Sequence, residues 1–168
     1  MAFRAARVLL PLAAALALCL AAAGCGQETP EGTVYKFLGS VQSHDLPAMR
    51  SCVNPEALKR VSEGDGELAR AWEGLYRVYL AAPVDWRMAF TGIRLEADYL
   101  DGERALVRIV SGRCVLYRRA GGAWIKKGEV DFAREDFVPL YLVRRDGVWY
   151  LEALDLYIIR ALEEAARS

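Results

Sequence analysis

The sequence predicts an α+β domain in which N-terminal helices pack on a curved antiparallel sheet. Between residues 29 and 80, apolar residues recur every three or four positions, which is the period of an amphipathic helix. From Val84 onward they alternate with polar residues, which is the period of a half-buried strand. Three turn signals, Asp101-Gly102, Gly121-Gly122 and Asp146-Gly147, divide this second part into hairpins.

The first helix is predicted from its start signal. Thr29-Pro30-Glu31 supplies an N-cap, a first-turn proline and a first-turn acid. Ser43-His44-Asp45 ends the helix. Its apolar stripe, spaced i, i+3, i+4 and i+7, consists of Val34, Phe37, Leu38 and Val41.

Further helical segments follow. A short helix around residues 47–53 would place Met49, Cys52 and Val53 inward, and Asn54-Pro55-Glu56 opens another turn. After a break at Gly64-Asp65-Gly66, a third amphipathic helix is predicted over residues 67–80. Its apolar stripe consists of Leu68, Trp72, Leu75 and Tyr79.

The first hairpin of the sheet is predicted to bend sharply. The apolar positions change parity at Gly92, from Trp86, Met88 and Phe90 before it to Ile93, Leu95 and Ala97 after it. If Leu100 faces Glu103 across the first turn, Gly92 lies opposite Ser111 and next to Gly112. Both strands would then lose side-chain bulk at the same level, which favours a bulge or bend.

The last two hairpins and a terminal helix complete the predicted domain. Gly121-Gly122 leads into a strand over residues 124–132. Across Asp146-Gly147, Arg145 is expected to face Val148, which places Leu142 opposite Leu151 and Leu140 opposite Ala153 on one apolar face. Asp155 can cap a C-terminal helix whose stripe is Leu156, Ile159 and Leu162.

The N-terminus has the pattern of an export signal. Residues 1–7 carry two arginines and no acid, and residues 8–23 carry no charge. This apolar run is shorter than the roughly 20 residues of a membrane-spanning helix. Leu20-Ala21-Ala22-Ala23-Gly24-Cys25 resembles the lipobox of bacterial lipoproteins, in which the cysteine thiol receives a diacylglyceryl group. Cleavage by ordinary signal peptidase after Ala23 is the alternative.

This resemblance divides the chain. It implies a signal peptide over residues 1–24, lipid attachment at Cys25, a short tether over residues 25–28 and one domain over residues 29–168. The protein would then lie outside the cytoplasmic membrane, held to that membrane or to an outer membrane.

The mature chain would be nearly balanced in charge. Without Arg4 and Arg7, it has 20 basic residues and 22 acidic residues. This balance does not indicate a nucleic-acid partner.

Two segments resemble the NTF2-like superfamily and its bacterial lipoproteins. They are the first helix with its Thr29-Pro30-Glu31 start and the segment Pro139 to Leu151 around the third turn. The resemblance implies a cone in which a bent sheet wraps around a long helix. Some members are enzymes that place an aspartate or a tyrosine inside the cone, and the corresponding candidates here are Asp98, Asp131 and Tyr117.

Motifs for catalysis and metal binding are absent from the sequence. His44 is the single histidine, and it lies beside Asp45 between two predicted helices, where a solvated loop is expected. The sequence contains no phosphate loop, no HExxH, no paired CxxC and no calcium loop. We therefore predict neither a cofactor nor a metal ion.

Two further sets of residues lead to specific hypotheses. Cys52 and Cys114 are the cysteines that remain after loss of Cys19 and lipidation of Cys25. In an oxidising compartment they could form a disulfide or stay as separate buried thiols. The four basic residues of the second hairpin could contact anionic lipid headgroups or could protect an edge strand. These residues are Arg118, Arg119, Lys126 and Lys127.

Three functional hypotheses follow from the sequence. The first is a membrane-anchored, non-catalytic binding or accessory module that takes a small apolar ligand or a protein partner. The second is a small NTF2-like isomerase or dehydratase with an acid inside the cone. The third is a structural partner in an envelope complex or a homodimer, which would use the outer face of the sheet.

Overall fold

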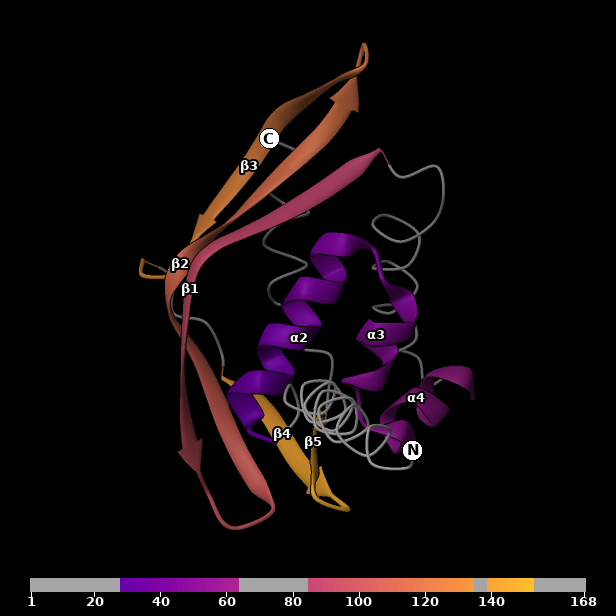
Figure 1. The fold of residues 1–168 in the computed structure, drawn as a ribbon, viewed down its shortest axis with the longest axis vertical. Helices are drawn as coiled ribbons and strands as arrows, with labels where there is room; N and C mark the ends of the chain where they lie inside the picture. The colour runs from indigo at the N-terminus through magenta and orange to yellow at the C-terminus, as the bar shows by residue number, and fades with distance from the viewer. Residues whose placement is uncertain (1–27, 64–84, 135–138, 153–168) are drawn as a thin grey trace, which may run out of the picture.

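The computed structural model describes residues 28–63, 85–134 and 139–152. In these residues, helices precede an antiparallel sheet, which confirms the α+β class (Figure 1). The elements are α2 (Pro30–Ser43), α3 (Leu46–Ser51), α4 (Pro55–Ser62), β1 (Trp86–Tyr99), β2 (Arg104–Ala120), β3 (Ala123–Asp131), β4 (Leu140–Arg145) and β5 (Val148–Leu151). The predicted signal peptide, Cys25, the helix over residues 67–80 and the C-terminal helix lie outside the described residues.

The boundaries of α2 follow the predicted signals, and α3 begins after a cap that the sequence analysis did not assign. The Thr29 side chain accepts a hydrogen bond from the Gly32 amide at 3.1 Å, with proline in the first turn of α2. His44 ends α2 in the left-handed conformation, with φ of 59°. The Asp45 carboxylate accepts a hydrogen bond from the Ala48 amide at 3.0 Å and caps α3. The first two helices are thus separated by two residues, each of which caps a helix.

The long strand β2 is the centre of the sheet. β1 pairs with it from Trp86↔Arg118 to Tyr99↔Ala105. The other side of β2 is shared, with β4 paired at its start and β3 paired at its end. The second and third turns are confirmed, because Ala120 faces Ala123 and Arg145 faces Val148. Ala153, the predicted partner of Leu140, lies outside the described residues.

The predicted bend of the sheet is confirmed at Gly92 and Gly112. Both residues have positive φ, 62° and 114° respectively, and the β1–β2 register shifts between Thr91 and Leu95. A side chain at Gly112 would place its Cβ 2.7 Å from the Ile93 Cα and 2.8 Å from the Gly92 oxygen. The two strands approach so closely at the bend that β2 has no room for a Cβ there.

The predicted register of the first hairpin is wrong by one residue. Tyr99 pairs with Ala105 and not with Arg104, so Leu100 does not face Glu103 as the last pair of the ladder. The Asp101 carboxylate accepts hydrogen bonds from the Glu103 amide at 2.9 Å and from the Arg104 guanidinium at 2.6 Å. These bonds lower the pKa of Asp101, the guanidinium contributing most. They stabilise a loop over residues 100–103 that is longer than a two-residue turn.

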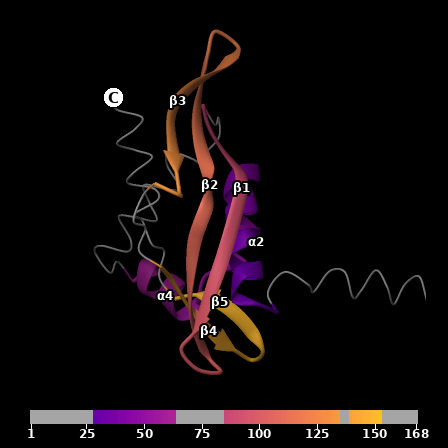
Figure 2. The same cartoon turned by 90° about the vertical axis from the view of Figure 1, so that its left-hand side faces the viewer.

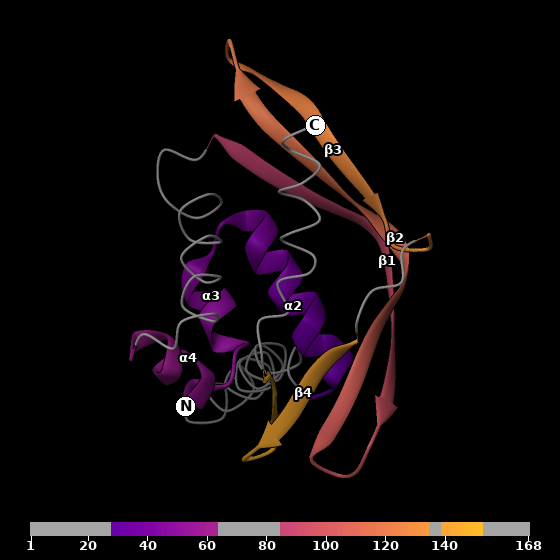
Figure 3. The same cartoon turned by 180° about the vertical axis from the view of Figure 1, so that it is seen from behind.

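The helix α2 lies in the concavity of the bent sheet (Figures 1 and 3). Val34 and Leu38 of this helix pack in one apolar cluster with Ala105, Leu142 and Trp149. Its C-terminal half contributes Val41 to a second cluster, which includes Met49, Met88, Leu116 and Phe132. Phe37, Phe90, Ile93 and Leu95 contact both clusters. The two clusters therefore meet at the bend of the sheet.

Candidate functional site: a pocket between α2 and β1

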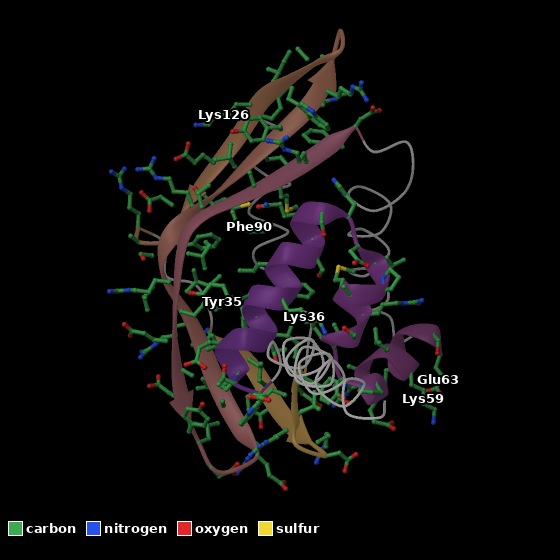
Figure 4. The ribbon with its side chains drawn as sticks, in the orientation of Figure 1. Tyr35, Lys36, Lys59, Glu63, Phe90 and Lys126 are labelled. Atoms are coloured by element: carbon green, nitrogen blue, oxygen red, sulfur yellow. The ribbon has the colours of Figure 1, made fainter. Side chains whose placement is uncertain are left out.

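One face of α2 is turned toward β1. Tyr35, Leu38, Gly39 and Gln42 are spaced i, i+3, i+4 and i+7, so they share one face of the helix. Figure 4 shows Tyr35 and Phe90 in the space between α2 and β1, with Tyr35 pointing toward the strand. Within the described residues, β1 pairs only with β2, and α2 covers part of its other edge.

Two hydrogen bonds connect α2 to β1. The Tyr35 hydroxyl donates to the Ile93 carbonyl at 3.1 Å. The Phe90 amide donates to the Gln42 side-chain oxygen at 2.7 Å. Both backbone groups belong to the edge strand next to its bulge, where the regular ladder to β2 is interrupted. The two bonds satisfy edge groups of β1 and fix the distance between helix and strand.

A pocket of about 290 Å³ lies between these two hydrogen bonds, partly open to solvent. Leu38, Phe90 and Ile93 give it an apolar wall. A Cβ at Gly39 would have no atom within 4 Å, so the missing side chain of this glycine leaves open space. The lining residues are Tyr35, Leu38, Gly39, Gln42, Phe90 and Ile93. This arrangement can hold a small apolar group against a few fixed polar atoms.

The acidic candidates from the sequence lie away from this pocket. Asp98 is exposed and forms an ion pair with Arg108 at 2.9 Å. Its neighbour Ala97 packs toward the core, so Asp98 lies on the outer face of β1. The Asp131 carboxylate accepts a hydrogen bond from the Ala133 amide at 3.1 Å and pairs with Arg134 at 3.4 Å. Each of these carboxylates interacts with nearby surface groups.

Tyr117 and His44 also lie outside the pocket lining. Tyr117 is on the outer face of β2, where the Arg87 guanidinium lies 5.3 Å from its ring centre. His44 is half-buried at the end of α2, and its amide donates to the last carbonyls of that helix. Its left-handed conformation serves the helix terminus.

Cys52 and Cys114 are free thiols in the structure. Both side chains are fully buried. The Cys52 thiol donates a hydrogen bond to the Ala48 carbonyl at 3.3 Å, while Cys114 lies among the core residues on the inner face of β2. Burial raises the pKa of both thiols, that of Cys114 to about 12. Both groups are therefore neutral and poor nucleophiles at physiological pH.

The four basic residues of the second hairpin are all exposed, and β1 brings further residues beside them. Arg118 stacks over Trp86, its cross-strand partner, at 5.4 Å. Lys126 pairs with Glu129, and this hydrogen bond is the main cause of a lowered pKa of Glu129. Sequence reasoning missed Arg87, Trp86 and Trp124 as members of this cluster. The observed register places Trp86 opposite Arg118 and Arg87 opposite Tyr117, and Trp124 lies on β3 opposite Arg119.

The pocket was not predicted from the sequence. The signal was available in Tyr35, Gly39 and Gln42, which form a second stripe on α2 beside the apolar one. A helix face that combines a tyrosine, a glycine and a glutamine lacks the continuous apolar bulk needed to fill a core. What covers such a face depends on where the bend places β1.

In the described part of the chain, no three or more histidine, cysteine, aspartate or glutamate side chains are grouped to hold a metal ion. None of the described helices combines the length and the apolarity that crossing a membrane requires. No family model matches the chain, and no curated protein matches its sequence.

Proposed function

We propose that the protein is a lipid-anchored, extracytoplasmic binding module of the NTF2-like lipoprotein type, with its ligand site in the pocket between α2 and β1. The pocket carries this proposal, because it combines an apolar wall with two fixed polar atoms. The curled sheet around α2 supports the NTF2-like cone. The sequence around Cys25 supports the anchor, with the lipid attached at that thiol.

The lining defines the class of ligand. A volume of about 290 Å³ lies at the lower end of small-molecule sites, which span about 300 to 1,000 Å³. The Tyr35 hydroxyl donates its proton to Ile93, which leaves its oxygen as an acceptor. The Gln42 oxygen is used by Phe90, which leaves its amide group as a donor. A small, mainly apolar molecule with one polar group fits these atoms, and an apolar side chain of a protein partner is the alternative occupant.

The enzyme hypothesis has less support from the geometry. General acid-base catalysis requires a titratable group within hydrogen-bond reach of the substrate. Asp98 and Asp131 are engaged with arginines outside the pocket, and the one titratable side chain in its lining, Tyr35, donates its hydroxyl proton to the Ile93 carbonyl. The structural-partner hypothesis, including a homodimer through the outer sheet face, requires an apolar surface there. The outer side of the β1–β2 ladder instead carries the ion pairs Arg94–Glu96 and Arg108–Asp98.

Filling the pocket tests the binding function. We expect Gly39→Leu to occupy the open space without a steric clash, because a Cβ there meets no atom within 4 Å. Gly102→Leu is the matched control, since Gly102 lies in the first turn and is equally free of neighbours. The measurement is native mass spectrometry of the full-length, membrane-extracted protein, which reports bound small molecules directly.

A copurified small molecule should be present on the wild-type and Gly102→Leu proteins and absent from Gly39→Leu. If the adduct stays on Gly39→Leu, or if the wild-type protein carries none, the small-molecule site is wrong.

A parallel activity screen with isomerase, dehydratase and ester substrates covers the enzyme hypothesis. Turnover that is abolished by Asp98→Asn or Asp131→Asn would replace the binding function with catalysis.

A further inference from the structure

The end of the sheet beyond α2 forms a projecting tip. We define the distal tip as residues 85–87 of the β1 start together with residues 117–127 of the β2–β3 hairpin. Figures 1 and 2 show the hairpin extending past the C-terminal end of α2, with both of its faces free of the described helices. Lys126 points outward from this hairpin in Figure 4.

Both faces of the distal tip carry an arginine on an aromatic ring. On the outer face, the Arg87 guanidinium lies 5.3 Å from the Tyr117 ring centre and 5.7 Å from that of Trp124. On the inner face, Arg118 lies over Trp86 at 5.4 Å. Alternation along the paired strands separates the two sets, because Arg87 faces Tyr117 and Trp86 faces Arg118. Each face therefore carries an arginine over an aromatic ring, and on the inner face Trp86 also packs against the core cluster that contains Met88 and Leu116.

The distal tip is strongly basic and partly apolar. Its basic residues are Arg87, Arg118, Arg119, Lys126 and Lys127, and its single acidic residue is Asp85. Trp124 and Ile125 are large apolar residues with exposed fractions of 40% and 46%. Glu129, which pairs with Lys126 and Arg113, marks the end of this basic region along β3.

This combination fits an anionic lipid surface better than a folded partner. Basic and aromatic residues lie on more than one side of the tip, and a fluid headgroup layer can contact all of them at once. Tryptophan and arginine place an apolar body and a polar end at the membrane–water boundary. Lysines and arginines near that boundary are attracted by anionic headgroups. Charge and shape thus point to the same occupant.

We propose that the distal tip inserts into the headgroup layer of an anionic membrane. The N-terminal end of α2 lies at the opposite end of the sheet, where Thr33 hydrogen-bonds to the Trp149 carbonyl. The tether over residues 25–28 spans at most about 3.5 Å per residue. The lipid on Cys25 belongs to the proposed function. For this lipid and the tip to enter the same bilayer, the long axis of the domain must therefore lie along the membrane surface.

The test uses the full-length, membrane-extracted protein reconstituted into phosphatidylcholine vesicles, with or without phosphatidylglycerol. Brominated acyl chains quench tryptophans that enter the membrane boundary, and the Trp124→Phe protein supplies the background signal. We expect quenching of Trp124 only in vesicles with phosphatidylglycerol. The double variant Arg118→Glu, Arg119→Glu should reduce the inserted fraction at least tenfold.

The third hairpin offers a matched control. Arg144 and Arg145 also precede a glycine-containing turn, and Arg144 stacks over Trp149 at 5.9 Å. The double variant Arg144→Glu, Arg145→Glu should leave Trp124 quenching unchanged. The proposal is overturned if quenching is equal in neutral vesicles or if the Arg118→Glu, Arg119→Glu variant is quenched as strongly as the wild type. It is also overturned if no vesicle quenches Trp124, which is the result expected if the tip binds an acidic protein. The mass of the Cys25 adduct in the same sample tests the anchor separately.

Discussion

Gly112 is the residue on which the curvature of the sheet depends most directly. Its φ of 114° is rarely adopted by residues with a side chain, and the Ile93 backbone occupies the space of a Cβ. Gly92, by contrast, has open space around its missing side chain. The bend therefore requires glycine at 112 for two reasons, conformation and contact, and at 92 for conformation alone.

Gly112→Ala is expected to destabilise the fold by about 3 kcal/mol, because it combines backbone strain with a clash between two strands. Urea unfolding of the full-length protein gives the free energy of unfolding. Gly102→Ala provides the control, since this glycine has free space and no positive φ. A loss below about 0.5 kcal/mol for Gly112→Ala, equal to that of the control, would contradict the close approach of the strands.

At the scale of elements, α2 is held by polar side chains to two strands, β1 and β5, and by one apolar stripe to the sheet. Tyr35 and Gln42 bind the edge of β1, while the buried Thr33 hydroxyl donates to the Trp149 carbonyl in β5 at 3.0 Å. The stripe residues Val34 and Leu38 pack on the sheet between these attachments. Helix α2 is thus held to both the edge strand and the last hairpin.

Thr33→Val should destabilise the protein by about 1 to 2 kcal/mol, because the variant keeps the shape of the side chain but leaves the buried carbonyl of Trp149 without this donor. Chemical unfolding monitored by tryptophan fluorescence measures the change. Ser43→Ala removes an exposed hydroxyl with a similar bond to the Gly39 carbonyl, which water can replace. If both variants lose the same stability, the Thr33 bond does not connect the helix to the hairpin.

At the scale of the whole molecule, the proposed anchor and the buried cysteines give a joint prediction. Of the four cysteines, Cys19 would leave with the signal peptide and Cys25 would be lipidated. The membrane-extracted protein should therefore show two reactive thiols after denaturation, from Cys52 and Cys114. It should show almost none when native, because both are buried and burial raises the pKa of each.

Thiol titration with and without guanidinium makes this measurement. A third thiol in denaturant would mean that Cys25 carries no lipid, and no thiols would mean that the two buried cysteines are bridged. The variant Cys25→Ser supplies the cellular control, since loss of the lipid should release the protein from membranes or leave it uncleaved. Mature-length Cys25→Ser protein that still fractionates with membranes would show another mode of attachment.

The sequence by itself determined the elements, because their signals are local. Thr29 caps α2 through a bond from the amide three residues away, and Gly121-Gly122 closes a turn between adjacent strands. The bend was also predictable, since the change of apolar parity at Gly92 coincides with Gly112 on the neighbouring strand. The register of the first hairpin was predicted wrongly, because hydrogen bonds that the Asp101 carboxylate accepts stabilise a loop longer than the usual two-residue turn.

Only the tertiary structure decided the site. The pocket requires α2 and β1, separated by about 50 residues, to meet at the bulge, and that distance depends on packing across the whole concavity. Strand position alone did not reveal whether Asp98 faces the concavity or the solvent, because a shift of one residue reverses the face of every side chain. The distal tip likewise joins three strands, so its paired arginines and aromatic rings appear only when β1, β2 and β3 are aligned.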